Sequence, residues 1–180
     1  MTELPPRDSR QRLLSALAQA DASSREARAD RIAWVSVHAV PFGAIWGRAE
    51  SLALLEEART CYVKGQNIAT LILALSYVEH AISDALPASA GRGLAKAISE
   101  ARTQGLFDLG LLGRADRLRE LRNPYVHRRP DDDADTLGAR ITERKAHPRS
   151  IQEEDAREAL EVMYGILREE LARNPPSVPE

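Results

Sequence analysis

The segment that most constrains the fold runs from Asn67 to Leu86, which is apolar around almost its whole circumference. One helical face of this segment carries large apolar residues at every third or fourth position, namely Ile68, Leu71, Ile72, Leu75, Val78, Ile82 and Leu86. The other side is filled mainly by Ala69, Leu73, Ala74, Tyr77 and Ala81. A helix that is apolar on both sides is buried by its neighbours. The sequence therefore predicts a central helix, ending before Pro87, with other helices packed around it.

The rest of the chain supplies those neighbours. Apolar residues recur with helical spacing in four further segments, at about 48–64, 94–103, 114–122 and 150–173. Gly65 and Gly105 are natural helix stops, and Ser150 to Glu153 form a capping-box pattern at the start of the last helix. We therefore expect an all-α fold, an up-and-down helical bundle of about five main helices with an N-terminal extension.

Two stretches depart from this pattern. Residues 1–47 form the extension, with a helix from Ser9 to about Arg28, in one piece or broken near Ala22, and then a short strand or apolar arm from Ile32 to Trp46. Within the bundle, over 48–173, Asn123-Pro124 is expected to break a helix and to lead into a mobile polar loop over 128–149. Residues 174–180 hold three prolines and are expected to be frayed.

Composition excludes several classes of protein. The net charge of −2 provides no global field that attracts nucleic acid, so any such binding needs a local patch. The chain has one cysteine, Cys61, which excludes an intramolecular disulfide framework. Its histidines and cysteine are not spaced as metal ligands are, so we expect no metal or cofactor site. The longest apolar run, from Ile68 to Leu75, is too short to span a membrane, so we expect a cytoplasmic protein without a membrane partner.

A polar constellation surrounds the expected helix break. Arg122 and Asn123 are followed by Pro124, and His127 comes five residues after the arginine. On an unbroken helix, side chains five residues apart point about 140° away from each other. A break at the proline would re-aim them, so that Arg122 and His127 could share one cleft.

These residues resemble the HEPN domain family (higher eukaryotes and prokaryotes nucleotide-binding), whose mark is an arginine, commonly followed by asparagine, with a histidine four to six residues beyond. The resemblance covers about residues 48–172 and includes Glu56-Glu57-Ala58, the turn from Tyr62 to Gln66, and the segment from Ser76 to Ala81. It implies a helical bundle and, in active members, metal-independent RNA cleavage between the two subunits of a homodimer. Toxin–antitoxin and phage-defence systems contain such enzymes, so an antitoxin or another partner protein is implied as well.

The chemistry of these residue types agrees with that implication. RNA is cut when its own 2′-hydroxyl attacks the neighbouring phosphate, which needs a proton acceptor and a cation. Histidine titrates near neutral pH and can accept or donate the proton. Arginine presents a planar fork of donors to phosphate oxygens. We therefore expect His127 to be the general base or acid, Arg122 the phosphate clamp and Asn123 a positioning residue.

Other residues are candidates for contact with RNA. Six arginines and two acids between Arg114 and Arg129 give a local charge of +4, and from these we expect Arg119, Arg128 and Arg129 to contact RNA, with Tyr125 stacking on a base or packing. The family resemblance makes Glu79 a possible supporting neighbour. The four aspartates at 131, 132, 133 and 135 either fold over this patch as a phosphate mimic or form a solvated loop.

Two alternatives stay open. A histidine beside a helix end also caps carbonyls, and Arg-Asn-Pro is ordinary turn chemistry, so the motif can be purely structural. The protein is then a non-catalytic module that binds RNA, nucleotide or a partner protein.

The toxin branch of the HEPN family that is paired with nucleotidyltransferase-type antitoxins carries tyrosine two residues after the histidine. Here Arg129 holds that position, so the branch stays unassigned.

Overall fold

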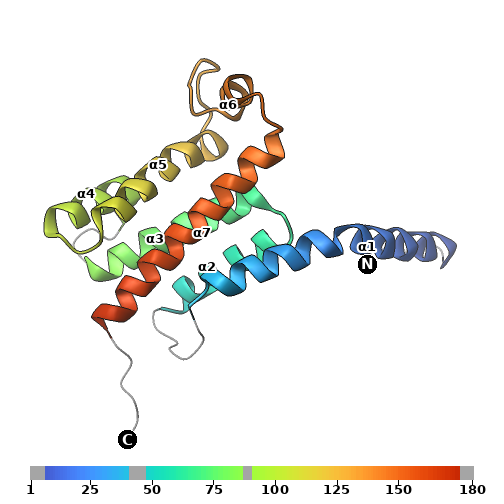
Figure 1. Ribbon diagram of the computed structural model, residues 1–180, viewed down its shortest axis with the longest axis horizontal. Helices are drawn as coiled ribbons and strands as arrows, with labels where there is room; N and C mark the ends of the chain where they lie inside the picture. The colour runs from blue at the N-terminus through green and yellow to red at the C-terminus, as the bar shows by residue number, and fades with distance from the viewer. Residues whose placement is uncertain (1–6, 41–47, 87–90, 175–180) are drawn as a thin grey trace, which may run out of the picture. The chain divides into compact units, whose positions relative to one another are not determined.

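The computed structural model describes residues 7–40, 48–86 and 91–174, and every secondary-structure element in these ranges is a helix (Figure 1). The predicted all-α class is therefore confirmed. The expectation of about five main helices is not exact, because the described part of the chain contains seven. The chain divides into two compact units, Met1–Val37 and His38–Glu180.

The first unit is dominated by α1 (Arg7–His38), a single helix of 32 residues. The helix expected from Ser9 to about Arg28 is present, in one piece. The short strand or apolar arm expected from Ile32 is wrong as far as His38, which is helical; residues 41–46 of this expected arm lie outside the described residues. The serines in the helix do not interrupt it, because their hydroxyls donate to carbonyls one turn earlier, as Ser23 does to Ala20 at 2.9 Å and Ser36 to Ile32 at 2.8 Å.

In the second unit, α3 (Asn67–Ala85) is the central helix, as predicted. It packs against α2 (Ala49–Val63), α4 (Leu94–Gln104), α5 (Leu109–Val126) and α7 (Pro148–Arg173). Among its side chains, Leu75, Val78 and Ile82 are completely buried. By length and composition, α3 is also the one helix in the described ranges that could cross a membrane. A core helix that packs against four other helices needs the same apolar composition as a helix that crosses a membrane.

The start of α5 differs from the sequence-based boundary. The apolar periodicity predicted a helical segment from about residue 114, but α5 begins at Leu109. Asp108 is the reason, since its carboxylate accepts a hydrogen bond from the backbone N–H of Leu111 at 2.8 Å and caps the helix. Gly105 ends α4 in the left-handed conformation, with φ of 63°, as its position predicted.

The segment expected to be a long loop contains a further helix, α6 (Leu137–Arg144), so the expectation of an unstructured 128–149 segment is wrong over these residues. A buried ion pair ties α6 to α7: the Arg140 guanidinium donates two hydrogen bonds, of 2.7 and 2.6 Å, to the carboxylate of Asp155. Both residues are less than a tenth exposed, at 7% and 6%. This long-range pairing cannot be read from local polarity, which is why the sequence pattern predicted a loop.

Removal of one partner from this pair should strongly destabilise the protein. Asp155→Ala leaves the Arg140 charge buried without a partner, and we expect the free energy of unfolding to fall by about 3–5 kcal/mol in urea denaturation. Glu154→Ala is the matched control, because it removes the exposed carboxylate that pairs with Arg144 and should cost less than about 1 kcal/mol. Equal effects of the two substitutions would show that the buried pair does not anchor α6.

Candidate nucleic-acid interface

The motif residues lie at the C-terminal end of α5, but the helix does not break where the sequence predicted. Arg122 and Asn123 are helical, and α5 continues through Pro124 to Val126. The backbone N–H of His127 still donates to the carbonyl of Asn123 at 2.8 Å, as in an uninterrupted helix. The expected break at Asn123-Pro124 is therefore wrong. Packing of Leu121, Asn123 and Tyr125 into the bundle outweighs the local cost of a proline two residues before the helix end.

The change of direction occurs instead at His127, the C-terminal cap of α5. Its backbone is extended, with φ of −134° and ψ of 135°, and its side chain is exposed. The side chains of Arg128 and Arg129, which follow, are exposed as well. The His127 imidazole therefore does not take the direction that a continued helix would impose. The end of α5 at His127, and not Pro124, causes this change of direction.

Arg122 is half-buried on the same part of α5. Its Nε atom is buried without a hydrogen-bond partner in the described part of the chain. Burial lowers the pKa of Arg122, while the nearby carboxylate of Glu79 on α3 opposes this and the Arg119 charge adds to it. The expected neighbourhood of Glu79 and Arg122 is therefore present, across the contact of α3 with α5. A partly desolvated guanidinium interacts strongly with an anion that reaches it.

Asn123 is buried and holds the helix end together. In the amide orientation that satisfies both of its polar groups, its nitrogen donates to the carbonyl of Arg119 at 3.1 Å. Its oxygen accepts from the guanidinium of Arg129 at 3.2 Å. Asn123 thus holds the side chain of Arg129, and it does not face the surface as a ligand-binding group would.

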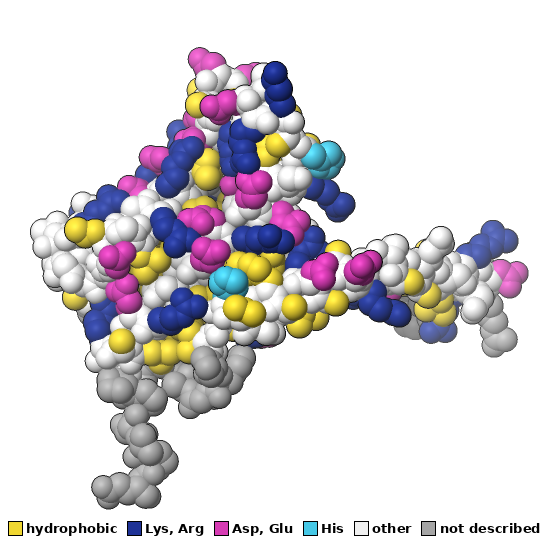
Figure 2. Space-filling view, in the orientation of Figure 1, with side chains coloured by type: hydrophobic (Ala, Val, Ile, Leu, Met, Phe, Trp, Pro, Cys, Tyr) yellow, Lys and Arg dark blue, Asp and Glu magenta, His cyan; other side chains and the backbone are white. Residues whose placement is uncertain are grey.

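Three of the six arginines of the expected basic patch are already paired with carboxylates. Arg114 donates to Glu158 and Glu161 of α7, Arg117 to Glu120 and Asp135, and Arg119 to Asp116. Figure 2 shows basic and acidic side chains intermixed on the visible face of the bundle, rather than a uniform basic surface. Arg119, expected to contact RNA, is thus held inside a structural ion-pair network, and the unpaired cations gather at the end of α5.

Tyr125 turns inward. Its hydroxyl oxygen is buried, and burial together with the charge of Asp155 raises the pKa of this phenol. Asp155 belongs to the buried ion pair between α6 and α7, so Tyr125 lies against the anchor of α6. This position favours the packing role of Tyr125 over stacking on a base.

The acidic run is partly folded onto α5. Asp135 forms an ion pair of 2.6 Å with Arg117, and the carboxylate of Asp133 accepts a hydrogen bond from the backbone N–H of Asp135 at 2.9 Å. Asp131 and Asp132 are exposed. One of the four aspartates therefore neutralises an arginine of the patch, which is the contact that the phosphate-mimic hypothesis needs.

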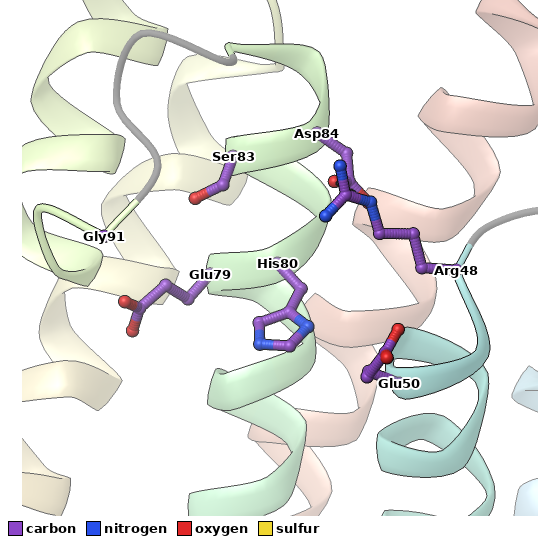
Figure 3. A pocket seen from close by; sticks show the side chains of 7 residues that line it. All are labelled: Arg48, Glu50, Glu79, His80, Ser83, Asp84 and Gly91. Atoms are coloured by element: carbon purple, nitrogen blue, oxygen red, sulfur yellow. Dashed lines mark ion pairs between the residues drawn. The ribbon is translucent and has the colours of Figure 1, made fainter.

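A cavity of about 490 Å³ lies where the C-terminal turns of α3 meet the N-terminus of α2 (Figure 3). Its charged and polar lining consists of Arg48, Glu50, Glu79, His80, Ser83 and Asp84. Of these residues, only Glu79 was predicted from the sequence. The available signal was the repetition of polar residues four apart at the end of an otherwise apolar helix, namely Glu79 with Ser83 and His80 with Asp84.

No group of three or more histidine, cysteine, aspartate or glutamate side chains in the described ranges is arranged to hold a metal ion. Comparisons with protein-family models, with curated proteins and with solved structures find no match to this chain. The resemblance to HEPN domains therefore depends on the motif residues themselves.

The pairing of Asp135 with Arg117 should compete with RNA. Asp135→Asn removes this competitor, so we expect single-stranded RNA to bind more tightly at low salt by up to about fivefold, the equivalent of one surface ion pair. Fluorescence anisotropy with a labelled oligonucleotide measures the change. Asp30→Asn on α1 is the control, since it alters the net charge equally but lies far along the sequence from the motif. Unchanged affinity in Asp135→Asn would reject the phosphate-mimic hypothesis.

Proposed function

We propose that this protein is a metal-independent endoribonuclease of the HEPN type. The observation that carries the proposal is the contrast along α5. Arg114, Arg117 and Arg119 are paired with carboxylates, whereas Arg122 and Arg128 make no hydrogen bond or ion pair with the residues that the structure describes. Arginines that form no ion pair at one helix end, beside an exposed histidine, suit an anionic polymer.

In this reaction, His127 takes the proton from a ribose 2′-hydroxyl as its oxygen attacks the adjacent phosphorus. The bond from phosphorus to the 5′-oxygen breaks, and that oxygen receives a proton from water or from a second imidazole. The products are a 2′,3′-cyclic phosphate and a 5′-hydroxyl. Arg122 stabilises the charge that develops on the non-bridging oxygens, and its partial burial strengthens this interaction because less water screens it.

A homodimer is part of the proposal. The end of α5 in one subunit offers few unpaired cations, and two copies facing one cleft would double the number that a phosphate backbone meets. The second subunit would also supply the second imidazole. A role in a toxin–antitoxin or phage-defence system, with an antitoxin or another partner protein, follows from the resemblance and forms part of this proposal.

The alternative is a non-catalytic module that binds RNA, nucleotide or a partner protein through the same helix end. The inward positions of Asn123 and Tyr125 favour it, because both residues contribute to the packing of α5 rather than to an open catalytic surface. Such a module would bind RNA and leave it intact.

Cleavage of single-stranded RNA in EDTA tests the proposal. We expect a cyclic phosphate at the new 3′ ends, and we expect His127→Ala to lower the cleavage rate by about 10²–10⁴-fold, the usual contribution of a general acid or base. His147→Asn is the matched control, because asparagine can still accept the hydrogen bond with which His147 caps α7. Full activity of His127→Ala would refute the assignment. RNA binding without cleavage by the unaltered protein would support the module instead.

A further inference from the structure

The cavity at the end of α3 has two walls of different character. Glu79 and Ser83, one helical turn apart, point toward the side of Gly91, while His80 and Asp84 point toward Arg48 and Glu50 of the α2 side (Figure 3). A Cβ at Gly91 would meet no atom within 4 Å, so the cavity is open beside Gly91. The volume of about 490 Å³ falls in the range of small-ligand sites, about 300–1,000 Å³.

The charges of the lining residues select the kind of group that can enter. Asp84 is neutralised by an ion pair of 3.2 Å with Arg48. Glu50 and Glu79 make no hydrogen bond or ion pair with other residues in the described ranges, so the described part of the lining, with three acids and one arginine, carries a net charge of −2. A phosphate would be repelled. A neutral group with N–H donors would instead find free carboxylate oxygens.

Glu79 also connects the cavity to the motif. Its carboxylate acts on the Arg122 guanidinium across the contact of α3 with α5. If Arg122 binds the phosphate at the cleavage point, a nucleotide next to that phosphate can turn its base toward Glu79. Single-stranded RNA is commonly recognised in this way, through the Watson–Crick edges of bases turned out of the strand.

We propose that this cavity is the base-recognition subsite of the proposed nuclease and that it selects guanine. Guanine is the standard base whose Watson–Crick edge presents two adjacent N–H donors, at N1 and at the exocyclic N2, and one carboxylate can accept both. Glu79 accepts this pair, and the Ser83 hydroxyl adds a further polar contact on the same wall. The inference rests on the proposed function, because it needs RNA held at Arg122.

Four short oligouridines test it, one unchanged and three with guanosine, inosine or adenosine at a central position. Fluorescence anisotropy at low salt measures their affinities for the full chain. We expect guanosine to be preferred over uridine by about tenfold, which corresponds to one bidentate contact. Inosine, which lacks the exocyclic N2 amino group, should lie between the two.

Glu79→Gln identifies the residue responsible. A glutamine amide can accept from only one donor and turns its own N–H₂ toward the second, so the ratio of guanosine to uridine affinity should fall to about one. Loss of the carboxylate beside Arg122 alone would weaken all four oligonucleotides equally and leave this ratio unchanged. Glu143→Gln, an exposed position on α6, is the matched control and should keep the full preference.

The outcomes separate this inference from the proposed function. Equal binding of all four oligonucleotides, or an unchanged guanosine preference in Glu79→Gln, overturns the guanine subsite and leaves the nuclease proposal intact. Absence of RNA binding by the unaltered protein overturns both. A guanosine preference that disappears in Glu79→Gln and persists in Glu143→Gln establishes the subsite.

Discussion

Burial of α3 against four neighbouring helices is the constraint on which the bundle depends. This helix contacts α2, α4, α5 and α7, and its apolar side chains leave no room for a charged group along its middle. Its two carboxylates, Glu79 and Asp84, therefore lie in the last two turns, where they line a cavity. The position of the cavity at the C-terminal end of α3 is a consequence of how the core packs.

The second organising interaction is electrostatic. The chain contains many arginines, and most of those on α5 are paired with carboxylates of α5, of α7 or of the acidic segment. Exposed pairs of this kind contribute little stability each, but they remove positive charge from the surface. The count of arginines is therefore a poor guide to nucleic-acid binding here, and the few cations without partners carry the functional argument.

The N-terminal part of α7 has a structural role that bears on the candidate site. Asp155 holds Arg140 of α6, and its charge also acts on the buried phenol of Tyr125 at the end of α5. Three segments that lie far apart in the sequence are thus joined close to His127. This arrangement explains how α5 can continue through Pro124, because packing at Tyr125 compensates for the hydrogen bond that the proline lacks.

Sequence alone determined the helical class, the central position of α3 and the residue types of the motif, because the periodicity of buried apolar residues is a local property that every helix displays along its own length. Only the tertiary structure decided that α1 is continuous as far as His38, that α6 exists and that α5 passes its proline. It also decided which arginines are neutralised and that polar residues of α2 and α3 enclose a cavity. These features depend on contacts between residues distant in the chain, such as Arg140 with Asp155, and no local pattern records such contacts.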